Sequence, residues 1–206
     1  MWVPAIPPER VDLGDVVVRR LTVADAAVVA AAVAENLEHL RPWMPWANPE
    51  SADERFQRRR LVEADAAWAR GADFGYGLFA ANGDDERLLG AFGLTARRGV
   101  KTLEIGYWLR ADATRRGLAT RAVEVLTDIA VDQPDVERVL VYCDEANHAS
   151  AAIPRRLGYR LERVVAVPPE ASAETGRQLE FVLRATEWRE RRAARERDDR
   201  NAEAEL

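Results

Sequence analysis

Residues 101–131 read KTLEIGYWLR-ADATRRGLAT-RAVEVLTDIAV, and this stretch decides the fold. Its first ten residues are rich in β-branched and aromatic side chains and contain no proline, which predicts a strand. In the last part apolar residues recur at the offsets of one helical face, which predicts an amphipathic helix. These apolar residues are Leu118, Ala122, Val125, Leu126 and Ile129. A strand, a short basic loop and a helix therefore follow one another directly.

Gly117 lies where the loop becomes the helix, after Arg115 and Arg116 and before the small residues Ala119 and Thr120. A glycine lets an anion approach the backbone closely, and the free amides and dipole of a helix start favour negative charge. This segment suits a pyrophosphate, and an ordinary turn with solvated arginines is the alternative. A Walker loop is excluded because the Gly-Lys-Ser/Thr ending is absent, and a dinucleotide fingerprint is excluded because its first two glycines are absent.

The window from Thr114 to Ala119 resembles the central motif of the Gcn5-related N-acetyltransferase (GNAT) superfamily, Gln/Arg-x-x-Gly-x-Gly/Ala, with threonine at the first position. A second signature of that superfamily is present as NHAS at 147–150 and LGY at 157–159. The stretches NLEHLRPWMPW at 36–46 and EIGYWL at 104–109 are similar to the RimJ/RimL type of ribosomal-protein N-terminal acetyltransferase.

The resemblance implies a mixed α/β fold with a twisted, mostly antiparallel sheet of about seven strands flanked by helices. A splayed central strand pair would form the cleft for acetyl-CoA, the implied co-substrate. The acceptor would be an amine, and no metal is implied. The implied contacts with acetyl-CoA come from Trp108, Leu109 and Arg110 along the pantetheine arm, and from Arg115, Arg116, Gly117, Leu118, Ala119, Thr120 and Asn147.

Glu104 lies in the predicted central strand, on the same face as Trp108 because side chains alternate. A carboxylate is unusual in a buried strand. Glu104 is therefore the candidate general base, acting through water with a pKa raised by burial. A salt bridge to a neighbouring strand is the alternative.

Many GNAT members carry a tyrosine seven residues after the motif asparagine, where it protonates the leaving thiolate, but this chain has Pro154 there. Ser150 is the nearest hydroxyl on the motif and is assigned the thiolate-stabilising role, with simple helix capping as the alternative. Because Pro154 cannot donate to the Ser150 carbonyl, the helix is expected to start late or to bend. Because the tyrosine is missing and Thr114 replaces the usual Gln or Arg, a CoA-binding module without catalysis remains an alternative hypothesis.

Trp43 and Trp46 flank Met44 and Pro45 and are candidates for a rigid apolar wall over the acceptor, with core packing as the alternative. Acidic Glu35 and Glu38 nearby could attract a cationic acceptor. A substantial fraction of an α-amine with a pKa near 8 is already neutral at cytoplasmic pH, whereas neutralising a lysine near 10.4 costs roughly 4 kcal/mol. The sequence therefore favours a protein or peptide N-terminus as acceptor, with a small amine such as an antibiotic or polyamine as the alternative.

The chain has 206 residues, which predicts a single domain with a core at 10–188 and a charged C-terminal helix or tail at 189–206. A net charge of −5 gives no support to nucleic-acid binding. There is no apolar run of membrane-spanning length and no signal peptide at the start, so we expect a cytoplasmic protein without a membrane partner. One cysteine, Cys143, is interpreted as a buried strand thiol, two histidines predict no metal site, and a homodimer stays open.

The remaining pattern predicts an extended segment at 1–15, a loop with short helical turns at 36–49, and further strands and helices. The strands are expected at 16–21, 74–81, 87–95, 138–143, 159–167 and 177–185. Helices are expected at 22–35, from the capping box at Ser51 to Gly71, and before Leu157. Asn82-Gly83 predicts a hairpin turn.

Overall fold

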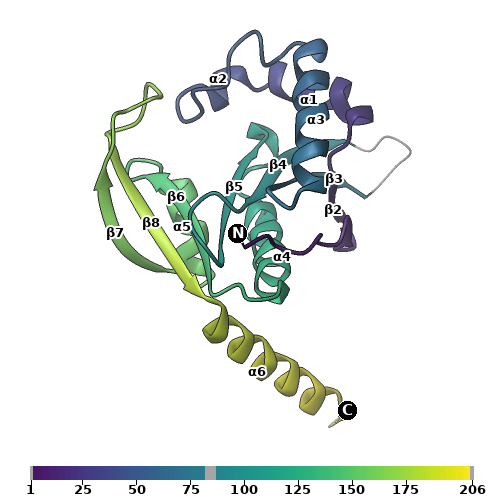
Figure 1. Cartoon of the computed structure of the whole chain (residues 1–206), viewed down its shortest axis with the longest axis vertical. Coiled ribbons are helices and arrows are strands. Elements are labelled where there is room, and N and C mark those ends of the chain that lie inside the picture. The colour runs from purple at the N-terminus through teal and green to yellow at the C-terminus, as the bar shows by residue number, and fades with distance from the viewer. Residues whose placement is uncertain (1, 82–86, 205–206) are drawn as a thin grey trace.

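A computed structural model describes residues 2–81 and 87–204 (Figure 1). One sheet of eight strands runs in the order β1-β2-β3-β4-β5-β6-β8-β7. The strands are β1 (Arg10–Asp12), β2 (Val16–Arg20), β3 (Asp73–Ala80), β4 (Leu88–Thr95), β5 (Thr102–Leu109), β6 (Arg138–Asp144), β7 (Arg160–Ala166) and β8 (Arg177–Arg184). All neighbours are antiparallel except β5 and β6. The predicted mixed α/β fold is confirmed, with β1 as an extra strand inside the segment expected to run over the surface.

Helices cover both faces of this sheet. They are η1 (Val23–Asp25), α1 (Ala26–Ala34), α2 (Leu37–Leu40), α3 (Glu54–Ala69), η2 (Ala111–Ala113), α4 (Leu118–Asp132), α5 (His148–Arg156) and α6 (Ala185–Ala204). On one face α1 and α3 bury Val29 and Leu61 against Phe79. On the other face α4 buries Leu126 in the main core together with Ile105. Figure 1 shows α1, α2 and α3 gathered on one side of the molecule.

The parallel strands β5 and β6 pair over three residues only, at Thr102 with Arg138, Leu103 with Val139 and Glu104 with Leu140. Beyond Glu104 the two strands diverge, although β5 continues to Leu109 and β6 to Asp144. The backbone of β5 is therefore unpaired on its β6 side along the second half of the strand. This is the splayed central pair that the sequence predicted.

Two helix starts differ from prediction. The Ser51 hydroxyl bonds to the Asn48 carbonyl, and α3 begins instead at Asp53, whose carboxylate accepts from the Phe56 amide. The capping box from Thr22 to Asp25 is present, but it opens the short η1 before α1 begins. At the start of α3 two candidate caps, Ser51 and Asp53, lie two residues apart, and a local motif cannot rank them.

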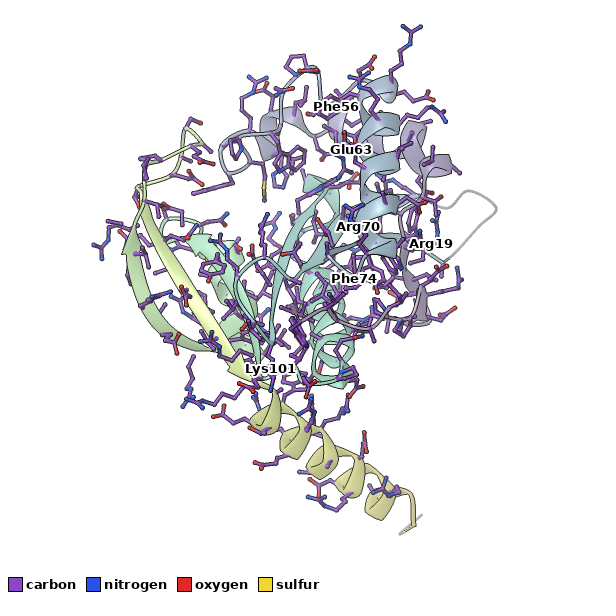
Figure 2. The ribbon with its side chains drawn as sticks, in the orientation of Figure 1. Arg19, Phe56, Glu63, Arg70, Phe74 and Lys101 are labelled. Atoms are coloured by element: carbon purple, nitrogen blue, oxygen red, sulfur yellow. The ribbon has the colours of Figure 1, made fainter. Side chains whose placement is uncertain are left out.

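The C-terminal helix α6 is anchored to α4 through its first three turns. The Trp188 indole donates to Asp128 at 2.7 Å, Arg192 pairs with Asp128 and Asp132, and Arg195 pairs with Glu124. The helix then leaves the body of the domain (Figure 2). Within residues 2–81 and 87–204 no helix is apolar and long enough to cross a membrane. The predicted Asn82-Gly83 turn lies outside the described residues, although the flanking strands β3 and β4 do pair antiparallel.

Candidate active site

Two cavities meet where β5 and β6 diverge. The α3 cavity has a volume of about 600 Å³ and lies on the side of α1 and α3. The α4 cavity has a volume of about 370 Å³ and extends to the start of α4. The two cavities share six of their lining residues, namely Trp43, Met44, Tyr107, Trp108, Asn147 and Ser150. A molecule in one cavity can therefore meet a molecule in the other at this junction.

The α4 cavity combines large apolar side chains, among them Trp43 and Trp108, with small residues at the start of α4. Gly117 has a left-handed backbone (φ +76°), and a Cβ placed on it would meet no atom within 4 Å. The first helical bond runs from the Arg121 amide to the Gly117 carbonyl, so the amides of 118–120 precede the bonded part of α4. Of the predicted CoA contacts, eight line this cavity: Trp108, Leu109, Arg115, Gly117, Leu118, Ala119, Thr120 and Asn147.

Arg110 and Arg116 do not line the α4 cavity. The Arg110 guanidinium is buried and pairs with Glu35 at 2.6 Å and with Asp112 at 3.2 Å. The next residue along the chain, Ala111, donates its amide to the Asn36 side chain at 2.9 Å. These contacts tie the junction of α1 and α2 to the end of β5, and a contact of Arg110 with the pantetheine arm stays a prediction.

The expected acidic attraction for a cationic acceptor is corrected. Glu35 is neutralised by Arg110. The Glu38 side chain is 87% exposed, pairs with Arg41 at 3.2 Å and lines neither cavity. Helix α2 turns Glu38 toward solvent, an orientation that the charge pattern alone does not fix.

Three polar residues form a row across the floor of the α3 cavity. Asp73 on β3 lies opposite Thr95 on β4, and Thr95 lies opposite Glu104 on β5. Glu104 shares its face with Trp108, which packs on the α1 and α3 side, whereas Ile105 belongs to the core on the α4 side. The predicted common face of Glu104 and Trp108 is confirmed.

Glu104 is buried and carries two ion pairs, with Arg97 at 2.8 Å and Arg98 at 2.9 Å. Burial raises the pKa of this carboxyl, but the hydrogen bonds and charges of the two arginines outweigh burial and hold the pKa below its ordinary value. The expected rise in pKa is therefore wrong. The salt-bridge alternative is observed, with partners from the loop after β4.

Asp73 was not singled out from the sequence. Asp73 is exposed to solvent on the cavity wall, but the nearby protein atoms partly desolvate its carboxyl and raise its pKa, while Arg97 and Arg60 partly oppose the rise. Among the described residues no side chain donates a hydrogen bond to it. The only sequence signal is its place directly before a buried strand, and that signal is weak.

The aromatic side chains of the 43–46 loop line the α3 cavity as expected. The Trp46 ring lies 6.1 Å from the Trp108 ring and the side chain is 39% exposed, while Trp43 is half-buried. Core packing is therefore not their main environment. The Ala173 amide donates to the Pro42 carbonyl at 3.0 Å, which joins the loop between β7 and β8 to this loop across the cavity.

Asp144 fixes the loop between β7 and β8 from the opposite side. Its carboxylate accepts from the Ala146 amide, the Thr175 amide and hydroxyl, and the Gly176 amide. Burial raises its pKa, but these four donors hold the pKa below the ordinary value. With its oxygens occupied, Asp144 fixes the loop rather than serving a substrate.

At the junction, Asn147 caps α5 by accepting from the Ser150 amide at 3.1 Å. Helix α5 begins at once at His148, so neither a late start nor a capping role for Ser150 is observed. The Tyr107 hydroxyl donates to the Ser150 carbonyl at 3.1 Å, and the Ser150 hydroxyl donates to the Tyr107 oxygen at 3.2 Å. Tyr107 is a second site residue that the sequence did not single out.

Cys143 is a buried thiol of β6, as predicted, and burial raises its pKa to about 11. Its sulfur is therefore protonated at neutral pH. Within the part of the chain that the structure describes, no three His, Cys, Asp or Glu side chains gather closely enough to hold a metal ion.

Residues 15–160 match the acetyltransferase (GNAT) domain family. The chain belongs to the GNAT acetyltransferase family. It is 30% identical over 146 residues to YdaF of Bacillus subtilis (strain 168), a proposed ribosomal N-acetyltransferase, covering 70% of this chain and 77% of that protein. As a member of this family it is an acyltransferase.

Solved GNAT structures share the fold. The structure of Mycobacterium smegmatis RimJ in complex with a CoA disulfide has a TM-score of 0.79 and 20% identity, and the match covers 90% of this chain and 91% of that one. The structure of RimL, a ribosomal L7/L12 α-N-protein acetyltransferase in complex with coenzyme A, has a TM-score of 0.76 and 19% identity, covering 87% of this chain and 98% of that one. The GNAT relatives thus include proteins of the RimJ and RimL type.

Proposed function

We propose that this acetyltransferase carries the acetyl group of acetyl-CoA to the N-terminal α-amine of a protein or peptide. The observation that supports it is the meeting of the two cavities at six shared residues. The α4 cavity would hold the donor and the α3 cavity the acceptor. Acetyl-CoA supplies an activated acyl group, and the chain supplies position, charge and proton transfer.

The residues of the α4 cavity suit acetyl-CoA. The amides at the start of α4 and the open space beside Gly117 fit a pyrophosphate, and Arg115 adds positive charge beside them. The unpaired edge of β5 beyond Glu104 offers backbone groups at Trp108 and Leu109 for the amides of the pantetheine arm. RimL and RimJ, which share the fold, are solved with CoA species.

For the acceptor, the relatives point to a protein N-terminus, because YdaF and RimL are both described as acting on ribosomal proteins. An acceptor of this kind would place the enzyme in the cytoplasm. The apolar wall of Trp43, Trp46 and Trp108 would hold the first residues of the acceptor against the cavity. A small amine is the competing acceptor.

Glu104 is the proposed general base, acting through water from the cavity floor. With its pKa held low by Arg97 and Arg98, it is ionised at neutral pH and accepts the proton of the amine only weakly. Such a base suits an α-amine, whose pKa of about 8 requires little help. Asp73, two strands away with a raised pKa, is the competing carboxylate.

Ser150 is the proposed stabiliser of the leaving thiolate. Its hydroxyl lies at the junction that both cavities share. A hydroxyl donor placed where negative charge develops on the sulfur lowers the barrier to C–S bond cleavage. Membership in an acetyltransferase family argues against a CoA-binding module without catalysis.

An acceptor screen tests the proposal. The purified protein is incubated with acetyl-CoA and one of three acceptors: a peptide with a free N-terminus, the same peptide with a blocked N-terminus and a free lysine, or a polyamine. Mass spectrometry then locates the acetyl group. We expect product on the free N-terminus and little on the lysine or the polyamine. Preferred acetylation of the polyamine would replace the protein acceptor with a small amine.

A further inference from the structure

A proline inside α5 leaves one helix carbonyl without its usual partner. In a regular helix the amide of residue 154 would donate to the carbonyl of Ser150, but Pro154 has no N–H. An unpaired carbonyl in a part-buried position is costly. The Tyr107 hydroxyl takes the place of the missing donor, at 3.1 Å from the Ser150 carbonyl oxygen.

The same tyrosine also contacts the serine side chain. The Ser150 hydroxyl donates to the Tyr107 oxygen at 3.2 Å, so the phenol touches both polar oxygens of Ser150. The Tyr107 ring lies against Phe92, with ring centroids 6.0 Å apart, and this packing fixes the ring on β5. Tyr107 and Ser150 both line the two cavities. The contact therefore lies where donor and acceptor meet.

Tyr107 is suited to hold a neighbour and not to give up its proton. Burial raises the pKa of Tyr107 well above its ordinary value. A thiolate of pKa near 8.5 cannot readily take a proton from such a phenol. The phenol stays neutral through the reaction and keeps its hydrogen bonds.

We infer that Tyr107 is the positioning residue that holds the Ser150 hydroxyl against the thioester sulfur, and that Pro154 makes this anchor possible by freeing the Ser150 carbonyl. This inference rests on the proposed acetyl transfer. As the new C–N bond forms, the C–S bond breaks and its electron pair goes to sulfur. The Ser150 hydroxyl then turns its hydrogen from the Tyr107 oxygen to the thiolate. Tyr107 keeps its bond to the carbonyl, and the amine proton leaves through water to the base.

Tyr107→Phe removes only the hydroxyl and tests the inference. We expect kcat to fall about tenfold, the effect of one misplaced hydrogen bond, while KM for acetyl-CoA stays within about twofold. The matched control is Tyr159→Phe. Tyr159 is also buried and shares a hydroxyl hydrogen bond with Thr127 at 2.7 Å, but it lines neither cavity. Wild-type kcat in Tyr107→Phe would overturn the inference, as would an equal loss in Tyr159→Phe.

A double-mutant cycle separates positioning from a merely structural role. If Tyr107 acts through Ser150, adding Tyr107→Phe to Ser150→Ala causes no further loss of kcat. Losses that multiply would overturn the inference. The rates are measured below the melting temperature of each variant, so that a change in folding does not enter.

Pro154→Ala gives a second test that leaves Tyr107 intact. The restored amide competes for the Ser150 carbonyl, so we expect kcat to fall severalfold and the effect of Tyr107→Phe to shrink in this background. Unchanged kcat in Pro154→Ala would overturn the role of the freed carbonyl. If the wild-type protein makes no acetylated product, the proposed function itself fails, which is a different result from any of these.

Discussion

The two cavities that meet at Tyr107 and Ser150 are built in different ways. The α4 cavity takes half of its lining from one continuous stretch of chain, from the end of β5 to the start of α4, and this stretch supplies the backbone amides and the glycine. The α3 cavity gathers side chains from segments far apart in the sequence, among them Trp43, Asp73 and Glu104.

This difference explains which parts of the site were predictable. A backbone site depends on local conformation, so a short motif carries it. A side-chain site depends on which strands become neighbours, and no short motif encodes that. The same contrast predicts that changes in the α4 cavity affect the donor, and that changes in the α3 cavity affect turnover or the acceptor.

The largest expected effect distinguishes the two carboxylates of the α3 cavity, Glu104 and Asp73. Glu104→Gln removes the proposed base, and we expect kcat to fall about 10²-fold with acetyl-CoA affinity nearly unchanged. Asp73→Asn, the matched change two strands away, should cost less than about tenfold. Steady-state kinetics with a peptide acceptor, together with calorimetry for the donor, measure both. A larger loss in Asp73→Asn would transfer the role of base to Asp73.

The next effect belongs to the α4 cavity. Gly117→Val places a side chain beside the amides at the start of α4, and we expect Kd for acetyl-CoA to rise at least about tenfold, or about 1.4 kcal/mol. Gly14→Val is the control, because Gly14 has a similar left-handed backbone (φ +86°), a Cβ added to it would also meet no atom within 4 Å, and it lines neither cavity. Both variants bear the same backbone strain. Equal affinity for acetyl-CoA in the two variants would show that its pyrophosphate does not bind beside Gly117.

A smaller effect is expected from the aromatic wall. Trp43→Ala and Trp46→Ala, made separately, should lower kcat/KM for the acceptor about fivefold while donor Kd stays constant. Because both side chains are partly exposed, the melting temperatures of the two variants should fall little. Trp188→Ala is the contrast, since this buried indole should cost about 3–5 kcal/mol of stability. A large fall in Tm for Trp46→Ala with normal acceptor kinetics would show that these residues serve core packing and not acceptor binding.

The smallest effect is a pH dependence of stability. The folded-state pKa of Glu104 is lowered, so its ion pairs stabilise the fold above the unfolded glutamate pKa of about 4.3, and this stabilisation is lost as pH falls through the folded pKa. We expect Glu104→Gln to be less stable than wild type by about 1 kcal/mol at pH 7. Urea unfolding should show this difference shrinking toward pH 3. A stability difference that does not change with pH would mean that the ion pairs of Glu104 with the two arginines do not stabilise the fold.

Much of the fold followed from local patterns. The strand and helix around Gly117 lie where the periodicity placed them, and α3 ends at Ala69, with Arg70 as its C-cap and Gly71 in a left-handed conformation, as predicted. The start of α3 was misplaced because Ser51 bonds to Asn48 and leaves Asp53 as the cap. Competing partners of similar strength decide such details, and these partners are set by the folded loop.

The site divides in the same way. The sequence alone determined the glycine at the start of α4 and the carboxylate of Glu104 on one face of β5, because these depend on local geometry and strand alternation, whereas the structure decided that Asn147 and not Ser150 caps α5. Only the tertiary structure decided that Arg97 and Arg98 lower the pKa of Glu104, that Asp73 lies two strands away, and that Tyr107 reaches Ser150. The physical reason is that pKa values and hydrogen bonds depend on distances of a few ångströms between residues far apart in the chain, and packing fixes those distances.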